Sequence, residues 1–457
     1  MKNHKKLSAI SFQLSAFALL VYAPVASAAA TTELTLRYQH HIFTLRAAQV
    51  NSWRTLREEW RYDGHAFRAP QELRTESDEQ RDLPAGVLRT RMEGWDREAI
   101  ATTLRTNVAA ILDRPAGQVV IHRAADGVVT FDGIGLPGRI LDIPASAVLI
   151  VAALDAGVTD ITLPVRETQP IMDIVDPALQ ALGITEVVTV GESEFAKSPA
   201  PRRHNIAVGL KRFNGHIIPR GETFSFNAVL GPVNAATGYK KELVILGERT
   251  LPDYGGGLCQ VSTTAYRGAW EYGLPITDRR NHSFAVRYYG PQGTDATVYP
   301  PNTDLQFTND TPGALLLQTH VDGDKAYFIY YGTRDGRSSD VYGPYTWDPK
   351  SPPADRSEYT ADIPPGTTRK VGDAVPGMRA AWFRVHDVVT ASGTTLESID
   401  SVYSIYEARP LFTQIGVPVG SPLLGNIPAD GGTSSVASSR SRSSAARSSL
   451  RPARRRN

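Results

Sequence analysis

One cysteine and one histidine stand out as a candidate nucleophile and base. Cys259 is the only cysteine in 457 residues, and the pattern of residues 260–272 predicts a helix that begins just after it. Free backbone N–H groups and a partial positive charge gather at a helix N-terminus, where they lower a thiol pKa and can hold an oxyanion. A cysteine nucleophile also needs a proton acceptor. His282 is the nearest candidate downstream, so we expect it to serve as the general base.

Three glycines before the cysteine predict where a substrate would bind. Gly255, Gly256 and Gly257 have no side chains, so a substrate backbone could lie close to the sulfur. Gln260 follows in the first turn of the predicted helix. We predict that these four residues contact the substrate, and that Gly257 and the N–H region of Cys259 form the oxyanion site.

The histidine begins a segment with strand periodicity. In residues 283–289, every second side chain from Phe284 to Tyr288 is large and apolar or aromatic, as in a strand with one buried face. Residues 296–299 form a second short strand pattern. Residues 290–293, which contain glycine and proline, could form a tight turn between them. We therefore predict an antiparallel hairpin that carries His282 at one end.

A carboxylate should orient the imidazole, and two candidates remain open. In a regular hairpin, Asp295 would lie roughly 20 Å along the strand from His282, which is too far for a contact. The same hairpin would bring the turn that contains Asp304 close to the histidine. Asp295 qualifies only if the segment is not a regular ladder, so both carboxylates are kept as candidates.

Simpler explanations of these residues also stand. A lone cysteine is commonly a small buried apolar residue, and a histidine at a strand end can bond to backbone. A zinc site made of cysteine, histidine and aspartate would show ligand spacings such as CxxC or HExxH, which this sequence lacks. We therefore predict no metal and no other cofactor, and we keep a structural cysteine as the alternative to a nucleophile.

The N-terminus predicts export. Lys2, Lys5 and Lys6 give a positive start, a mostly apolar stretch follows, and Ala26-Ser27-Ala28 provides an A-x-A cleavage pattern. The apolar stretch is short for a membrane span. We expect residues 1–28 to be a signal peptide, with an uncleaved anchor as the alternative, and the protein to act in the cell envelope or outside the cell.

The C-terminus differs in composition from the rest of the chain. From Gly431 onward it contains seven arginines among serines and no acidic residue, although the whole chain has a formal net charge of only +2. Such a segment cannot bury a core, so we predict that residues 417–457 are disordered. The arginines could bind an anionic wall polymer or a membrane surface. No specific nucleic acid partner is indicated, and a solvated tail without a partner is the alternative.

Length and composition predict a multi-domain α+β protein. Hydrophobic residues make up 41% of the chain and charged residues 21%, which is typical of globular proteins. In the second of the segments below, Asp96 is predicted to cap a helix, and residues 125–127 are predicted to turn a hairpin. The predicted segments are a β-rich N-terminal segment (29–92), a compact α+β module (93–168), a third segment with the candidate site (169–335) and a small β-rich appendage (336–416).

Several motifs of the third segment occur in the order found in one known family. They are Asn214 to Asn227, the Gly238-Tyr239 pair, Gly255 to Tyr266, Arg280 to Ser283, Gly293 to Val298 and Asp304 to Asn309. Over about residues 200–332 the chain resembles the VanW family, named for an accessory gene of vancomycin-resistance clusters. Residues 93–168 resemble, more weakly, the peptidoglycan-binding module that often precedes VanW domains. The resemblance implies a role in the cell envelope.

The order of the candidate residues also resembles that of known cysteine enzymes. A helix-borne cysteine, a histidine at a strand edge and then a carboxylate are the general plan of papain-like, transglutaminase-like and NlpC/P60-like enzymes. We therefore predict a cysteine-bearing helix on an antiparallel sheet. The expected function is that of an exported protein that acts on peptidoglycan or its stem peptides, as a cysteine-dependent peptidase or as an acyl or peptidyl transferase. The alternative is a non-catalytic protein that binds the cell wall.

Overall fold

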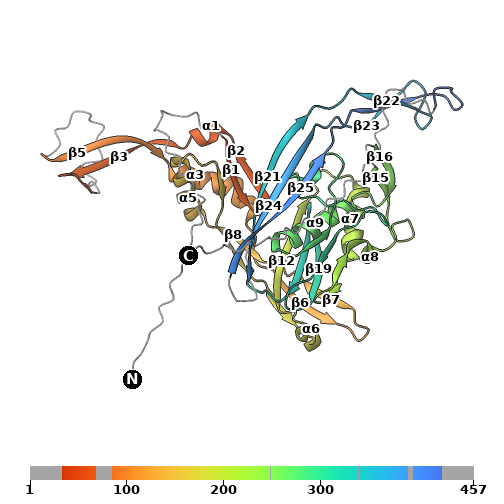
Figure 1. Ribbon diagram of the computed structural model, residues 1–457, viewed down its shortest axis with the longest axis horizontal. Coiled ribbons are helices and arrows are strands. Elements are labelled where there is room, and N and C mark those ends of the chain that lie inside the picture. The colour runs from red at the N-terminus through yellow and green to blue at the C-terminus, as the bar shows by residue number, and fades with distance from the viewer. Residues whose placement is uncertain (1–32, 68–84, 247–248, 338, 390–394, 425–457) are drawn as a thin grey trace, which may run out of the picture.

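The computed structural model describes residues 33–67, 85–246, 249–337, 339–389 and 395–424. The predicted signal peptide and most of the predicted tail lie outside these residues. Helices and strands are mixed along the chain (Figure 1), which agrees with the predicted α+β class. The helices are α1 (Ala47–Asn51), α3 (Arg97–Leu104), the π-helical η1 (Arg105–Ala109), α4 (Ala110–Leu112), α5 (Ile143–Asp155), α6 (Pro177–Ala181), α7 (Ala200–Lys211), α8 (Phe226–Leu230), α9 (Leu258–Tyr272) and the 3₁₀ turn η2 (Arg287–Tyr289).

The N-terminal strands and the helices that follow them share one hydrophobic core. β1 (Leu34–Tyr38) pairs with β2 (His41–Leu45) and, in parallel, with β9 (Asp160–Thr162). Apolar side chains of β1, β2, α3 and α5 form a single cluster. The boundary predicted near residue 92 therefore passes through a packed core, because the pairing of β1 with β9 joins residues from both sides of it.

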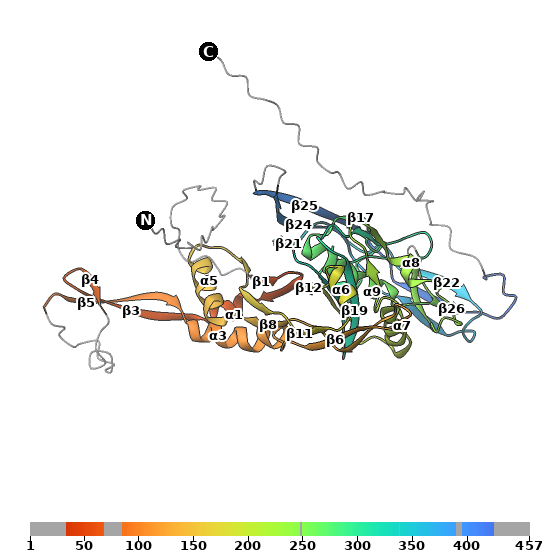
Figure 2. The same cartoon turned by 90° about the horizontal axis from the view of Figure 1, so that it is seen from below.

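A long hairpin projects from this core. β3 (Arg54–Tyr62) pairs along its length with β5 (Val87–Trp95), and β4 (His65–Phe67) adds a third strand. Figure 2 shows the hairpin extending away from the rest of the described chain. Its two ends at the base are held by Trp53 and Trp95, which are buried in the N-terminal core.

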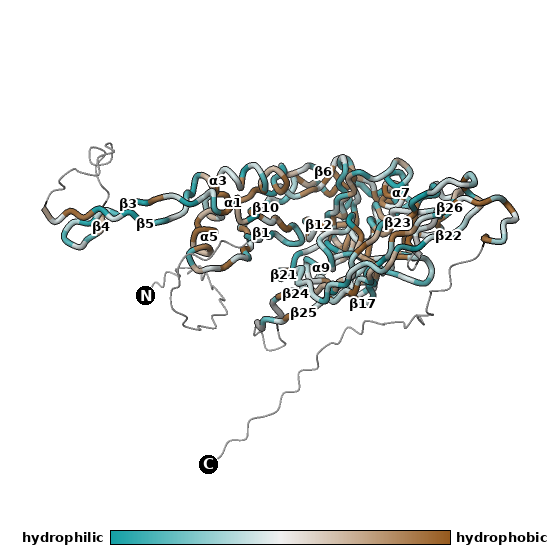
Figure 3. The backbone as a smooth tube through the Cα atoms, turned by 90° about the horizontal axis from the view of Figure 1, so that it is seen from above, coloured by the Kyte–Doolittle hydropathy of each residue, from teal (hydrophilic) through white to brown (hydrophobic). Residues whose placement is uncertain are grey.

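An antiparallel sheet forms the centre of the third segment. Its strands lie in the order β12 (Glu186–Glu194), β20 (Lys325–Gly332), β19 (Leu315–Asp322) and β13 (Ile217–Ile218). Figure 3 shows apolar segments gathered in the body of the molecule, beside β12 and α9. Smaller sheets surround the centre: β14 (Thr223–Ser225) with β18 (Gln306–Thr308) and β17 (Ile276–Asp278), β15 (Lys241–Leu246) with β16 (Arg249–Tyr254), and β8 (Gly138–Leu141) with β10 (Val165–Thr168).

The helix that carries Cys259 lies directly on this sheet. α9 packs against β12 and β20 and is buried over nearly its full length. A Cβ atom built on Gly268 of α9 would lie 2.6 Å from the backbone nitrogen of Gly191 in β12. Glycine at both positions therefore allows helix and strand backbones to touch. A cysteine-bearing helix on an antiparallel sheet was expected, whereas a papain-like or transglutaminase-like architecture stays a prediction.

The region 93–168 contributes to two different cores. Asp96 caps α3 as predicted, and its carboxylate accepts the N–H groups of Glu98 and Ala99. The hairpin predicted around residues 125–127 is also present, as β6 (Gln118–Arg123) and β7 (Val129–Gly133). With β11 (Ile171–Ile174) it packs against β19 and β20, away from the helices of the N-terminal core. Figure 1 shows β6 and β7 beside the central sheet.

The C-terminal strands form two further sheets. β21 (Ser339–Lys350), β24 (Gly377–Val389) and β25 (Thr395–Tyr406) make one antiparallel sheet. β22 (Arg356–Thr360), β26 (Phe412–Gly416) and β23 (Thr368–Gly372) make the other. Val341 and Trp382 of the first sheet belong to the same hydrophobic cluster as α9. The C-terminal strands are thus packed onto the segment that carries the candidate site.

Membrane-spanning and metal-binding features were sought in the same residues. No helix in the described ranges combines the length and the apolar character needed to cross a bilayer. Nor do three or more His, Cys, Asp or Glu side chains of the described chain come together as a metal-binding group.

Candidate active site

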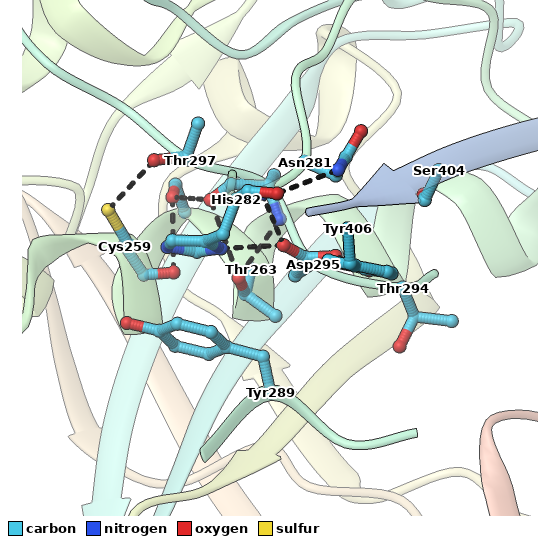
Figure 4. Close-up of polar contacts among 12 residues, drawn as sticks. Cys259, Thr263, Asn281, His282, Tyr289, Thr294, Asp295, Thr297, Ser404 and Tyr406 are labelled. Atoms are coloured by element: carbon cyan, nitrogen blue, oxygen red, sulfur yellow. Dashed lines mark hydrogen bonds and ion pairs between the residues drawn. The ribbon is translucent and has the colours of Figure 1, made fainter. Parts of the chain in front are cut away.

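His282 and Asp295 form a buried pair (Figure 4). His282 Nδ1 lies 2.6 Å from Asp295 Oδ2, and the His282 backbone N–H donates to the same oxygen at 2.8 Å. Each side chain is 2% exposed. The ring of Tyr289 stacks on the imidazole, with 4.3 Å between the ring centres. A carboxylate and an aromatic ring therefore fix the position and the orientation of the imidazole.

The hairpin predicted around this pair is wrong. Residues 283–289 and 296–299 are irregular, apart from η2 and one isolated bridge. Their backbone partners include side chains of α9: Ser262 Oγ donates to the Ala296 carbonyl oxygen at 2.6 Å, and Thr263 Oγ1 accepts the Ala296 N–H at 3.1 Å. Because α9 rather than a strand partner holds this loop, Asp295 lies beside His282.

Cys259 lies in the first turn of α9, as predicted. The helix begins one residue earlier, with Gly257 as its N-cap. The half-buried sulfur lies 3.4 Å from Thr297 Oγ1 and 3.6 Å from the Val298 carbonyl oxygen. The thiol therefore faces the same loop that carries the histidine and the aspartate (Figure 4).

Cys259 and His282 line one cavity of about 420 Å³. Its walls come from the glycine run, from the β15–β16 hairpin and from residues 284–289. Apolar and aromatic side chains provide much of the lining. The charged side chains of the lining are Arg202, Glu242, Asp253 and Arg409. A concave site of this size, with a few polar groups and a reactive pair, is typical of a site for a small ligand or for part of a larger substrate.

The electrostatic surroundings favour the charged forms of Cys259, His282 and Asp295. Burial raises the pKa of the Cys259 thiol, but the adjacent His282 imidazole outweighs burial and lowers the pKa overall. Burial lowers the pKa of His282, but the hydrogen bond to Asp295 and the nearby thiol raise this pKa to about 9. Burial also disfavours the charged form of Asp295, yet the bond to His282 and the charge of Arg279 hold its pKa below the usual range. The pKa shifts of the three groups therefore all run toward their charged forms, namely thiolate, imidazolium and carboxylate.

The second imidazole nitrogen is left for the reaction. His282 Nε2 is buried, and nothing in the described chain forms a hydrogen bond with it. A buried polar atom without a partner costs free energy, so Nε2 is the position at which a thiol proton or a substrate proton would be held.

The glycine run is required by the packing of the protein itself. Gly255 and Gly257 have φ angles of +84° and +113°, which favour glycine. A Cβ atom on Gly256 would lie 2.8 Å from the Leu243 carbonyl oxygen of β15. All three glycines line the cavity, and their contact with a substrate stays a prediction. Gly256 lets the β15–β16 hairpin close against the helix N-terminus, and Gly257 does the same for α7, since its Cβ would lie 3.0 Å from Arg202 Cγ.

Asp304 does not contact the imidazole, so its proposed role as the partner of His282 is wrong. Asp304 Oδ2 accepts the hydroxyl of Ser225 at 2.6 Å, and Oδ1 accepts the Asn227 N–H at 2.9 Å. These contacts stabilise the N-terminus of α8, which follows β14 of the neighbouring sheet. Because the preceding loop is irregular, Asp295 contacts the imidazole and Asp304 does not.

Gln260 does not line the cavity, so its predicted contact with the substrate is also wrong. Its side chain is fully buried. Its Oε1 accepts Arg202 Nη2 at 3.0 Å, and its Nε2 donates to Ser193 Oγ at 2.8 Å. One position after the cysteine on a helix points about 100° away from it, which here means toward β12.

Among the residues of this site that sequence reasoning missed, two follow residue 400. The hydroxyl of Tyr406, the last residue of β25, donates to Asp295 Oδ1. Arg409 lines the cavity and lies over the Phe284 ring, 4.4 Å from its centre. No local pattern marks Tyr406, because its partner lies 111 positions earlier in the chain.

Replacing His282 with alanine is expected to raise the pKa of Cys259, because the imidazolium is lost while burial remains. Alkylation by iodoacetamide follows the thiolate fraction, so the wild-type rate should rise with pH around a pKa below the free-thiol value of about 8.5. The pKa read from the His282→Ala curve should lie above that value. Each unit by which this pKa rises slows alkylation at pH 6 about tenfold. Turnover by the wild type should fall again as pH rises through about 9, where His282 loses its proton.

A matched control for this substitution lies on the projecting hairpin. His65 in β4 is exposed, and His65→Ala should leave the alkylation curve unchanged. If His282→Ala gave the wild-type curve, the electrostatic coupling between the thiol and the imidazole would be disproved.

Comparison with known proteins covers the part of the chain that contains the site. Residues 201–331 match the family described as VanW like protein. The chain is 34% identical over 139 residues to the uncharacterized protein YoaR of Bacillus subtilis (strain 168). It is 29% identical over 126 residues to the vancomycin B-type resistance protein VanW of Enterococcus faecalis (strain ATCC 700802 / V583). These matches cover 30% and 26% of this chain, and the chain spans about half the length of these curated relatives, 46% of each. The similarity to the VanW family therefore covers residues 201–331, the range that contains Cys259, His282 and Asp295.

Proposed function

We propose that this protein is an exported cell-envelope enzyme that uses Cys259 to cleave or transfer an acyl or peptide bond in peptidoglycan. The observation that supports it most is the shared cavity, where a helix-terminal thiol lies beside an imidazole held by a buried carboxylate. Nucleophile, base and orienting carboxylate are the three parts that acyl transfer by a cysteine requires.

The chemistry assigns one role to each group. His282 Nε2 takes the thiol proton, and the thiolate attacks the substrate carbonyl carbon to form a C–S bond, while the C=O electron pair moves to oxygen. When the oxyanion collapses, the bond to the leaving amine breaks and the amine takes the proton from His282. Water or an acceptor amine then attacks the thioester, gives a proton to His282 and releases the Cys259 thiolate. Asp295 remains a carboxylate throughout and stabilises the imidazolium.

Backbone amides near the cysteine suit the oxyanion. The N–H groups of Leu258 and Gln260 donate to the carbonyl oxygens of Gly255 and Gly257. Those of Gly257 and Cys259 have no backbone acceptor in the described chain. Free amides at the positive end of a helix stabilise negative charge as it develops. We therefore assign the oxyanion site to the amides of Gly257 and Cys259.

The choice of peptidoglycan rests on the sequence and on one relative. The N-terminus has the features of a signal peptide, and the Enterococcus relative is named as a vancomycin B-type resistance protein. Both direct the proposal to the cell envelope, where stem peptides supply the carbonyl groups that a cysteine nucleophile attacks. Weak resemblance of residues 93–168 to a peptidoglycan-binding module points to the same substrate.

Analysis of digested cell wall tests this function. The purified full chain is incubated with peptidoglycan sacculi, which are then digested with a muramidase, and the muropeptides are separated and weighed. We expect muropeptides to appear or disappear relative to a sample whose Cys259 has been blocked with iodoacetamide. Unchanged muropeptides together with co-sedimentation of the protein would instead support the alternative, a non-catalytic wall-binding protein.

A further inference from the structure

The catalytic carboxylate is held from its far side by the C-terminal sheet. The hydroxyl of Tyr406 donates to Asp295 Oδ1 and accepts the Gly293 N–H at 2.7 Å. Arg279 Nη2 lies 3.3 Å from the same Oδ1. Tyr406 is only 1% exposed, and Figure 4 shows it beside Asp295. With Oδ1 occupied in this way, Oδ2 is directed to His282.

The whole loop around the catalytic pair is attached to the same sheet. Residues 279–295, here called the site loop, contain no strand and so have no ladder partner of their own. At least four hydrogen bonds besides those of Tyr406 join them to β24, β25 and the residue after β25. They run from Trp382 Nε1 to the Gln292 carbonyl oxygen (2.7 Å), from Asn281 Nδ2 to that of Ile405 (2.8 Å), from Arg279 Nη1 to Ser404 Oγ (3.0 Å) and from the Glu407 N–H to the Ser283 carbonyl oxygen (2.7 Å).

We propose that the β21–β24–β25 sheet is part of the active site, with Tyr406 as a positioning residue for Asp295. This inference rests on the proposed function. The sheet begins at residue 339, outside the matched range 201–331, so a VanW-like domain in this chain is completed by a neighbouring unit. Tyr406 is not among the residues that line the cavity, and it acts through the Asp295 carboxylate and the Gly293 N–H.

The physical reason is that few hydrogen bonds fix the orientation of the buried Asp295 carboxylate. Without the Tyr406 hydroxyl, Oδ1 would keep only the longer contact with Arg279. The carboxylate could then turn about its Cβ–Cγ bond, and the imidazole would lose its fixed orientation. Because small displacements of a catalytic base are costly, we expect turnover to fall about tenfold to a hundredfold.

Tyr406→Phe in the full chain is the test, since it removes one hydroxyl and keeps the ring. Tyr403→Phe is the matched control, because Tyr403 lies on the same strand but on its opposite, exposed face. Two quantities are compared: turnover of sacculi per iodoacetamide-reactive thiol, and the downfield proton resonance of the His282–Asp295 hydrogen bond, assigned by its absence in His282→Ala. We expect Tyr406→Phe to lower turnover and to broaden the resonance beyond detection. Tyr403→Phe should change neither quantity.

The outcomes separate this inference from the proposed function. A resonance that is unchanged in Tyr406→Phe overturns the inference, whatever happens to turnover. If the wild type turns over no peptidoglycan, the proposed function fails, while the resonance still decides whether Tyr406 positions Asp295. If Tyr406→Phe does not fold, Tyr406 is replaced with 3-fluorotyrosine, which keeps the size and donates more strongly. That replacement must move the resonance upfield, because a carboxylate with less charge is a weaker acceptor, and an unmoved resonance again overturns the inference.

Discussion

Replacing Cys259 with alanine is expected to abolish turnover of peptidoglycan while the protein stays folded. No other cysteine exists to take over as nucleophile, so the rate should fall by a factor on the order of 10³ or more. The thiol is half-buried at the edge of the main hydrophobic cluster, and its hydrogen bonds to Thr297 and Val298 are long. Its loss should therefore lower the free energy of unfolding by about 1 kcal/mol or less. Muropeptide analysis and a thermal melt of both proteins measure the two effects.

The wild-type protein alkylated at Cys259 serves as the control for this experiment. It should lose turnover in the same way as Cys259→Ala, because both changes remove the nucleophile. A large fall in melting temperature in Cys259→Ala, with turnover lost only because the domain unfolds, would show instead that the cysteine is a structural residue.

Local patterns were sufficient to predict a helix that begins near Cys259, whereas the role of Cys259 as a nucleophile stays a prediction. Gly257 and Cys259 at the start of α9 follow from rules that involve only neighbouring residues, namely helix periodicity and the use of glycine where φ is positive. The caps and hairpins that were predicted correctly, such as Asp96 at α3, depend on the same short range. His282, chosen as the nearest downstream histidine, lines the same cavity as Cys259, and its role as the base stays a prediction.

The third member of the site could not be assigned, because its position depends on distant contacts. Residues 283–289 alternate as a strand does, but in the structure they bond to Arg267 of α9 and to Glu407 after β25 rather than to a strand partner. The two backbone groups of Ala296 bond to hydroxyls of Ser262 and Thr263 on a helix. No rule of hairpin geometry includes such partners. The regular hairpin that placed Asp295 too far from His282 therefore does not describe this segment.

The domain boundaries stay predictions, but contacts that the sequence does not reveal cross two of them. The break placed near residue 92 ignored the pairing of β1 with β9, whose residues are more than 100 positions apart. The break placed near residue 335 separated Tyr406 from Asp295. Composition changes at both places, but composition does not report which strands pair or which hydroxyl reaches a buried carboxylate.

Asp295→Asn is expected to cause a loss of turnover close to that of Cys259→Ala. The carboxamide is uncharged and cannot stabilise the imidazolium, so burial would lower the pKa of His282 and the pKa of Cys259 would rise. Loss of the orienting carboxylate in comparable catalytic groups lowers the rate by about 10⁴. Because the thiol now ionises at higher pH, the rise of iodoacetamide alkylation with pH should also shift upward. Muropeptide analysis at pH 7 and the alkylation curve measure these effects.

Asp304→Asn is the matched control, since it makes the same chemical change at the carboxylate that sequence reasoning left open. Asp304 accepts hydrogen bonds from Ser225 and from the Asn227 backbone at α8, and an amide oxygen can replace only some of these. The substitution should cost about 1 kcal/mol of stability, as the loss of a helix cap does, and should leave turnover and the alkylation curve within about twofold of the wild type. The opposite result, with Asp304→Asn inactive and Asp295→Asn active, would mean that the pair seen between Asp295 and His282 is not the one that works during the reaction.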